Sequence, residues 1–178
     1  MKVTVAMPCF NGEKFLRQAI DSVLCQTEKD IELLVCDDGS TDSSVKIVEE
    51  YTRKDSRVCL VQHLMNQGIG KARQTLVEQA RGTFLCFLSV DDLFFPQSVE
   101  VLLKQAVEHE GCFVFSDYEI IDGAGVKVQD FVVPRFVSWE DFVVGLVFTA
   151  RQSRMFVNLN TVLGRTELWK KVGFDVGL

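Results

Sequence analysis

Hydrophobic residues along this chain alternate between two patterns. Five short segments are almost continuously apolar, at residues 3–7, 31–36, 58–61, 84–88 and 112–115. Parallel strands that are covered on both faces show this pattern, because neither face meets water. The segments between them carry apolar residues every three or four positions, which is typical of helices with one buried face. The alternation predicts an α/β fold with a mostly parallel, Rossmann-like central sheet and helices on both faces.

Four helices are predicted from apolar residues at helical spacing. They carry Phe15, Ala19, Ile20, Val23 and Leu24; Val45, Val48 and Tyr51; Ile69, Ala72, Leu76 and Ala80; and Val99, Leu102, Leu103, Ala106 and Val107. Asn11 and Asp42 precede the first two helices. Side chains of this type often accept a hydrogen bond from the first backbone N–H groups of a helix, so we expect them to be N-caps.

The pattern becomes less regular after Tyr118. We expect a turn at 122–125, strands at 126–133 and 156–163, and helices at 139–147 and 166–172. No linker of low complexity interrupts the chain, and its length suits one domain. We therefore interpret it as a single domain, with an α/β half over residues 1–118 and the start of a second, incomplete region over residues 119–178.

Composition narrows the class of protein. The chain has 178 residues, of which 47% are hydrophobic and 25% charged, and its formal net charge is −6. This is the profile of a soluble globular protein. The negative charge and the lack of a Lys/Arg run argue against nucleic acid as a partner. Nothing resembles a signal peptide, and no apolar run reaches the ~20 residues of a spanning helix. We expect a cytoplasmic protein, compatible with peripheral association at the inner face of a membrane.

The six cysteines do not indicate a metal site. They lie at positions 9, 25, 36, 59, 86 and 112, without a C-x-x-C pair, and the chain has only two histidines, His63 and His109. Zinc sites need closely spaced Cys and His ligands. Cys36, Cys59 and Cys112 each lie in an apolar run, as Cys86 does, so we expect small buried residues in a reducing compartment.

Polar and acidic residues follow the ends of the predicted strands. In an open parallel sheet, ligands bind beyond the carboxyl ends of the strands. Those ends carry Pro8-Cys9-Phe10-Asn11-Gly12, Asp37-Asp38-Gly39-Ser40, the segment from Asn66 to Arg73, and Ser89-Val90-Asp91-Asp92. Two neighbouring carboxylates repel each other unless a positive group lies beside them. A divalent cation bound to a diphosphate is such a group.

Alternative interpretations exist for each motif. Gly68-Ile69-Gly70 begins like the dinucleotide fingerprint, but Arg73 stands where the third glycine would be, and the motif follows the third strand. A helix N-terminus that faces an anion, with Lys71 and Arg73 in its first turn, fits better. Taken alone, each Asp pair could be only a helix-capping turn. Their appearance at two ligand-facing strand ends favours a functional site.

Taken together, these motifs resemble glycosyltransferase family 2, an inverting group with the GT-A fold. The matching segments are residues 6–12; Gln26-Thr27 with residues 31–44; Asn66-Gln67-Gly68 with Ala72-Arg73; residues 82–92 with Pro96; and residues 171–175. They cover essentially the whole chain. The resemblance implies transfer of a sugar from a nucleotide-diphosphate donor, with a UDP-sugar expected, to a saccharide or lipid-linked acceptor, as in polysaccharide biosynthesis.

The resemblance also implies roles for individual residues. The expected contacts to the nucleotide sugar are Pro8, Cys9, Phe10, Asn11, Glu13, Asp37, Asp38, Gly68, Lys71, Arg73 and Asp91. Asp38 would accept a hydrogen bond from the uracil ring, while Asp37 would support its loop. Asp91 and Asp92 would hold Mg²⁺ or Mn²⁺, which neutralises charge on the leaving diphosphate.

Two departures from the family pattern bear on activity. Ser89 stands where the family usually has an Asp, so the usual Asp-x-Asp is Ser-x-Asp here. The family's catalytic base is usually an Asp that follows the segment at 171–175, so we expect it beyond Leu178. A catalytic glycosyltransferase domain is the leading hypothesis. A non-catalytic nucleotide-sugar-binding module and another nucleotide-binding α/β enzyme are the alternatives.

Overall fold

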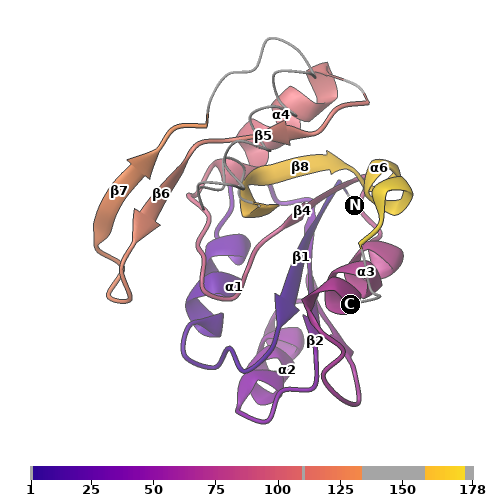
Figure 1. The fold of residues 1–178 in the computed structure, drawn as a ribbon, viewed down its shortest axis with the longest axis vertical. Helices are drawn as coiled ribbons and strands as arrows, with labels where there is room; N and C mark the ends of the chain where they lie inside the picture. The colour runs from indigo at the N-terminus through magenta and orange to yellow at the C-terminus, as the bar shows by residue number, and fades with distance from the viewer. Residues whose placement is uncertain (1, 110, 134–158, 175–178) are drawn as a thin grey trace, which may run out of the picture.

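The computed structural model describes residues 2–109, 111–133 and 159–174. A six-stranded sheet lies at its centre (Figure 1). Its strand order is β3-β2-β1-β4-β8-β5. The strands of this sheet are β1 (Val3–Cys9), β2 (Ile31–Asp37), β3 (Val58–Gln62), β4 (Phe84–Phe87), β5 (Val114–Phe115) and β8 (Val162–Arg165). A separate hairpin is formed by β6 (Tyr118–Ile121) and β7 (Lys127–Phe131).

The first four strands are parallel, and β1, β2 and β3 end at the same level, while β4 ends opposite Ala6 of β1. Strand β1 pairs with β2 on one side and with β4 on the other, and β2 pairs with β3. Asp37 lies opposite Cys9 of β1 and Gln62 of β3. All seven residues of β1 and of β2 are buried, as their continuous apolar character predicts. The mostly parallel central sheet is confirmed.

Helices cover both faces of the sheet. They are α1 (Leu16–Leu24), α2 (Ser44–Lys54), α3 (Ile69–Gln79), α4 (Ser98–Glu108) and α6 (Thr166–Val172), with a short 3-10 turn, η1 (Leu159–Thr161), before β8. One apolar core lies between the sheet and α1, α2 and α4, and it includes Ile20, Val48 and Leu102. The other core lies between the sheet and α3 and α6, and it includes Leu76 and Trp169. The predicted two-faced arrangement is therefore confirmed.

One charged residue lies inside β2 and is paired there. Glu32 is fully buried, and its carboxylate accepts hydrogen bonds from Thr4 Oγ1 at 2.6 Å, from the backbone N–H of Arg81 at 2.8 Å and from Arg81 Nε at 2.9 Å. Burial by itself would raise the pKa of Glu32, but these donors outweigh it and lower the pKa. Arg81 thus helps to hold the sheet together.

The second half of the chain departs from the predicted order of strands. Strand β8 runs antiparallel to both neighbours and lies between β4 and β5. Instead of a strand over 156–163, the described residues show η1 and then a strand that begins at Val162. A local apolar pattern does not specify a strand's partner or direction. The position of β8 between β4 and β5 could therefore not be predicted from it. The helix at 166–172 is confirmed, and the helix predicted at 139–147 lies outside the described residues.

Strand β5 is also shorter than predicted, which changes the expectation for one cysteine. It begins only at Val114, and Cys112 is exposed, whereas Cys36 and Cys86 are buried and Cys59 is half-buried. Strand β7 occupies most of the segment predicted at 126–133 and pairs with β6, with Tyr118 stacked on Phe131. Among the described residues, no helix is long and apolar enough to cross a membrane.

The predicted helix caps are only partly correct. Helix α1 begins after Phe15, and Asn11 lies four residues earlier, in the left-handed region with a φ of 51°. The prediction for Asn11 is therefore wrong, because its side chain bonds another loop instead of its own helix. Ser43 holds the N-cap position of α2, but Asp42 Oδ1 accepts the backbone N–H of Ser44 at 2.9 Å. Asp42 therefore satisfies a first-turn N–H from one position further out.

Candidate functional site

The loops that follow β1 and β2 are joined by reciprocal hydrogen bonds. Five backbone N–H groups donate to side chains of the opposite loop: Asn11 to Ser40 Oγ (2.9 Å), Gly12 to Ser44 Oγ (2.9 Å), Glu13 to Asp42 Oδ2 (3.0 Å), Thr41 to Asn11 Oδ1 (2.9 Å) and Ser43 to Glu13 Oε2 (2.9 Å). The side chains of Asn11 and Glu13, predicted to contact the donor, thus brace the neighbouring loop. The result is one fixed edge at the carboxyl ends of the strands.

Asp38 ties this edge to the loop after β3. Its side chain is only 5% exposed, and the carboxylate has three partners: His63 Nδ1 lies 2.6 Å from Oδ1, Gln67 N–H donates to Oδ1 at 3.0 Å, and Gly68 N–H donates to Oδ2 at 2.8 Å. Hydrogen bonds to a charged acceptor are among the strongest in proteins. The orientation of the Asp38 carboxylate is therefore fixed by the protein.

Two glycines make this close approach possible. Gly39 has a φ of 75°, and a Cβ there would lie 2.6 Å from the backbone of Met65 and Asn66. Gly68 precedes α3 with a φ of 89° and a ψ of 159°, a conformation that is essentially restricted to glycine. A side chain at Gly39 would push the loop after β3 away from Asp38, whereas a side chain at Gly68 would meet open space but would strain the backbone. Asp37 stabilises the loop after β2, because its Oδ2 accepts the backbone N–H of Ser40 at 3.1 Å.

A cavity of about 270 Å³ opens between these loops. It is lined by Pro8, Cys9, Phe10, Asp38, Asn66, Gly68, Ile69 and Ala72. Phe10 is 49% exposed, so its ring is available to a ligand. Burial raises the pKa of the Cys9 thiol to about 11, so Cys9 is a neutral packing group at pH 7 and not a nucleophile. The structure thus brings five predicted donor contacts, from three loops, to one cavity.

The second acidic pair lies after β4, where the chain turns. The N–H of Asp92 donates to the carbonyl of Ser89 at 3.1 Å, and Asp91 is exposed while Asp92 is half-buried. Burial and the negative charge of Asp91 raise the pKa of Asp92. A Cβ added at Gly12 would lie 3.1 Å from Val90, so the loop after β1 touches this turn. The two acidic ends therefore belong to one continuous site.

Asn160 joins this turn from a distant part of the chain. Its side-chain amide donates to Asp92 Oδ2, and it lies 3.1 Å from Ser89 Oγ, the residue that replaces the family's usual Asp. Asn160 belongs to η1 and is brought here because β8 pairs with β4. The sequence interpretation missed Asn160, since it placed this residue inside a strand. His63 was also missed, although its position directly after β3 was a usable signal.

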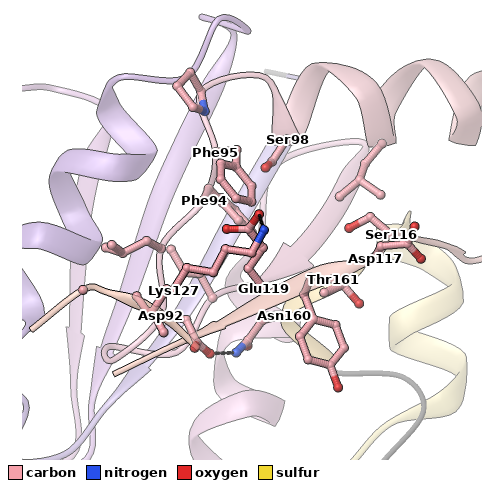
Figure 2. A pocket seen from close by; sticks show the side chains of 17 residues that line it. Asp92, Phe94, Phe95, Ser98, Ser116, Asp117, Glu119, Lys127, Asn160 and Thr161 are labelled. Atoms are coloured by element: carbon pink, nitrogen blue, oxygen red, sulfur yellow. Dashed lines mark hydrogen bonds and ion pairs between the residues drawn. The ribbon is translucent and has the colours of Figure 1, made fainter. Parts of the chain in front are cut away.

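A larger cavity, of about 340 Å³, is lined in part by Asp92. Figure 2 shows Asp92 and Asn160 at one end of this cavity, with Phe94 and Phe95 from the loop before α4 along its wall. The hairpin contributes Glu119 and Lys127, which form an ion pair at 2.9 Å. The cavity is thus a mixed aromatic and charged space that opens directly beside the acidic pair.

Neither Lys71 nor Arg73 is among the residues that line the two cavities. The guanidinium of Arg73 lies 5.9 Å from the centre of the Phe174 ring, and its Nε is buried without a hydrogen-bond partner among the described residues. Burial lowers the pKa of Arg73. The proximity of these two cations to phosphate therefore stays a prediction.

The acidic pair fits a divalent cation that also binds a ligand. Within the described residues, no group of three or more His, Cys, Asp or Glu side chains could hold a metal by itself, and neither Asp91 nor Asp92 forms an ion pair there. Two carboxylates without a cationic partner are the donor set that Mg²⁺ uses together with substrate phosphates. The raised pKa of Asp92 agrees with a site that needs a positive charge.

The fold and this edge define an α/β domain with an acidic, ligand-facing end of the GT-A type. The model of the glycosyl transferase family 2 matches residues 4–154. The chain therefore belongs to glycosyltransferase family 2, as the sequence motifs indicated.

Curated relatives and solved structures agree with this assignment. The chain is 34% identical over 137 residues to the Escherichia coli UDP-Glc:alpha-D-GlcNAc-diphosphoundecaprenol beta-1,3-glucosyltransferase WfgD, covering 77% of this chain and 53% of the relative. It is 36% identical over 117 residues to the Streptococcus pneumoniae glycosyltransferase GlyA, covering 66% of this chain and 17% of the relative. This chain thus spans about half, or less, of these relatives' length.

The solved structure of S. aureus TarS 1–349 in complex with UDP superposes with a TM-score of 0.78 at 25% identity, covering all of this chain and 51% of that one. The Pyrobaculum calidifontis mannosyltransferase PcManGT, in complex with GDP-Man and Mn²⁺, superposes with a TM-score of 0.72 at 18% identity, covering 99% of this chain and 48% of that one. The second likeness concerns the fold alone. Both agree with the GT-A architecture.

Proposed function

We propose that this domain binds a nucleotide-diphosphate sugar, with UDP as the nucleotide, and transfers the sugar with inversion in the presence of Mg²⁺ or Mn²⁺. The observation that carries the proposal is the continuous edge from Asp38 to Asp92. At one end a fixed carboxylate lines a cavity of about 270 Å³ beside Phe10. At the other end Asp91 and Asp92 lie at a turn that Gly12 touches through Val90.

The base would enter the cavity between Phe10 and Gly68. An aromatic ring offers a stacking surface to a flat base, and Asp38 offers an acceptor to a ring N–H. Residues that shape this end from the loops after β1, β2 and β3 are Pro8, Cys9, Phe10, Asn11, Glu13, Asp37, Asp38 and Gly68. Lys71 and Arg73 would add positive charge on α3 near the phosphates. The TarS structures with UDP and with UDP-GlcNAc, both 25% identical to this chain, support uracil as the base.

The diphosphate would lie against Asp91 and Asp92. A divalent cation held by these two carboxylates would neutralise the charge that develops on the leaving diphosphate. Asn160 orients Asp92 by donating to it. In the reaction, an acceptor hydroxyl forms a bond to the anomeric carbon as the bond to the diphosphate breaks, and the proton of that hydroxyl passes to a base.

The cavity in Figure 2 would take the sugar groups on the far side of Asp92. Phe94, Phe95 and Tyr118 provide apolar faces, and Glu119 provides a hydrogen-bond acceptor. We accordingly assign residues 1–118 to the nucleotide half and residues 119–178 to the acceptor side. The name of the relative WfgD includes a diphosphoundecaprenol-linked substrate. This supports a saccharide or lipid-linked acceptor and a place at the inner face of a membrane.

A non-catalytic nucleotide-sugar-binding module of the same fold is the second candidate, and Ser89 favours it. A hydroxyl is a weaker ligand for a hard cation than the carboxylate that the family usually has there. A module of this kind would bind the donor without cleaving it.

Titration calorimetry with UDP, GDP, CDP, ADP and NAD, each with and without Mn²⁺, tests the proposal. We expect UDP to bind most tightly and to bind more tightly with Mn²⁺, and NAD not to bind. Preferred binding of NAD would contradict the proposal in both forms. Hydrolysis of a UDP-sugar, measured by release of UDP, then separates the enzyme from the binding module, because the module would leave the donor intact.

A further inference from the structure

His63 has a largely buried side chain at the donor site, and neither the family resemblance nor the proposed function gives it a role. It follows β3 directly, and its side chain is only 9% exposed. One ring nitrogen, Nδ1, lies 2.6 Å from Asp38 Oδ1, and the other, Nε2, lies 3.0 Å from Thr75 Oγ1 of α3. A ring held at both nitrogens cannot turn, so His63 is fixed between the base cavity and α3.

The hydrogen bond from His63 occupies one of the acceptor positions of the Asp38 carboxylate. A carboxylate can accept about four hydrogen bonds, two at each oxygen. Oδ1 accepts two, from His63 and from the N–H of Gln67, while Oδ2 accepts one, from the N–H of Gly68. The bond at 2.6 Å is short enough to be strong, and Nδ1 must carry its proton for an ionised carboxylate to accept it. A single acceptor position, on Oδ2, is therefore left at Asp38.

We propose that His63 is a positioning residue that sets nucleobase specificity by fixing the Asp38 carboxylate with one acceptor position left for a ligand. A base is then favoured if it presents a ring N–H at its pairing edge, as uracil does. Cytosine presents an unprotonated ring nitrogen there, which would face a negative oxygen. The inference rests on the proposed nucleotide site, and it adds the residue that makes the recognition directional.

The two ring nitrogens can be tested separately with amide side chains. In His63→Asn the amide nitrogen takes the place of Nδ1, so the donor to Asp38 is kept and the contact with Thr75 is lost. In His63→Gln the amide lies near the position of Nε2, so the contact with Thr75 is kept and the donor to Asp38 is lost. Thr75→Val removes only the hydroxyl and is the matched control for the far side of the ring.

The measurement is the affinity for UDP and for CDP, by calorimetry in Mn²⁺, with melting temperatures for all four proteins. Loss of a hydrogen bond to a charged group corresponds to roughly a tenfold change or more. We expect His63→Gln to bind UDP about tenfold more weakly and to lose most of its preference for UDP over CDP. His63→Asn and Thr75→Val should stay within about threefold of the wild type for both nucleotides.

The outcomes separate this inference from the proposed function. Wild-type affinity and selectivity in His63→Gln would overturn it. So would equal losses of UDP and CDP binding in all three variants in step with melting temperature, because that pattern indicates a purely structural role. A wild-type protein that binds no nucleoside diphosphate would instead refute the proposed function itself. Loss of UDP selectivity in His63→Gln, with His63→Asn retaining it, supports the role of Nδ1.

Discussion

The two acidic ends of the site are built in opposite ways. Asp38 is almost fully buried, and its charge is met by a histidine and two backbone N–H groups. Asp92 accepts a hydrogen bond from Asn160, but burial and the neighbouring Asp91 raise its pKa. A carboxylate that must point one lone pair at a base benefits from rigid donors. A carboxylate that must attract a cation benefits from being left with negative charge nearby.

The two ends also differ in where their supports come from. The partners of Asp38 lie on the loop after β3, only 25 to 30 residues away along the chain. Asn160, the partner of Asp92, is 68 residues away and arrives through the antiparallel strand β8. The base end is thus complete within the parallel part of the sheet, whereas the acidic turn is completed by the second half of the chain.

The largest expected effect is at the cation end. Asp91→Asn deletes one charge and keeps the shape of the side chain, so it should remove most of the coupling between Mn²⁺ and UDP. Changing a residue that only supports a metal ligand typically lowers metal affinity by roughly 10–100-fold. We expect the loss in Asp91→Asn, which changes a ligand itself, to be at least as large. Titration of Mn²⁺ with and without UDP measures it. If the variant still couples metal to nucleotide, the cation site lies elsewhere.

The second effect concerns the base end. Asp38→Ala should weaken UDP binding by roughly tenfold or more, because it removes a charge-assisted hydrogen bond to the base. Asp38→Asn is the matched control for shape, and pyrophosphate with Mn²⁺ is the matched ligand without a base. Calorimetry should show that UDP binding falls in both variants and that pyrophosphate binding does not. Unchanged UDP affinity in a folded Asp38→Ala protein would remove the base-binding role.

A third change tests the link between the two halves of the chain. Asn160→Ala removes the donor to Asp92 and should weaken Mn²⁺ binding in the presence of UDP by about tenfold, the lower end of the range for outer-shell partners. Binding of UDP without metal should hardly change, because Asn160 does not line the base cavity. Metal titrations by electron paramagnetic resonance give the comparison. Equal losses with and without metal would show that Asn160 acts on the fold instead.

The smallest effect is expected at Ser89. Ser89→Ala should change Mn²⁺ affinity by less than about threefold, since a hydroxyl is a weak ligand for this cation. Ser89→Asp restores the residue usual in the family and should strengthen Mn²⁺ binding, although it also places a carboxylate near Asp92. The same metal titrations compare the two variants. A large loss in Ser89→Ala would mean that the contact between Ser89 and Asn160 positions Asp92 more strongly than we propose.

The parallel part of the molecule could be predicted from the sequence because its signals are local. The continuous apolar character of β1 and β2 required two covered faces, and this placed Cys9 and Asp37 at a common edge. The close contact of the loops after β2 and β3 was not predictable in detail. It depends on φ values of 75° at Gly39 and 89° at Gly68, and on a hydrogen bond from His63 to Asp38.

The sequence by itself determined that this protein is an α/β domain of glycosyltransferase family 2 with acidic strand ends. Only the tertiary structure decided that β8 would lie between β4 and β5, that Asn160 would join Ser89 and Asp92, and that His63 would fix Asp38. The physical reason is the range of the interactions. Apolar periodicity is written in neighbouring residues, whereas a hydrogen bond between residues 25 to 71 positions apart leaves no mark on the sequence around either partner.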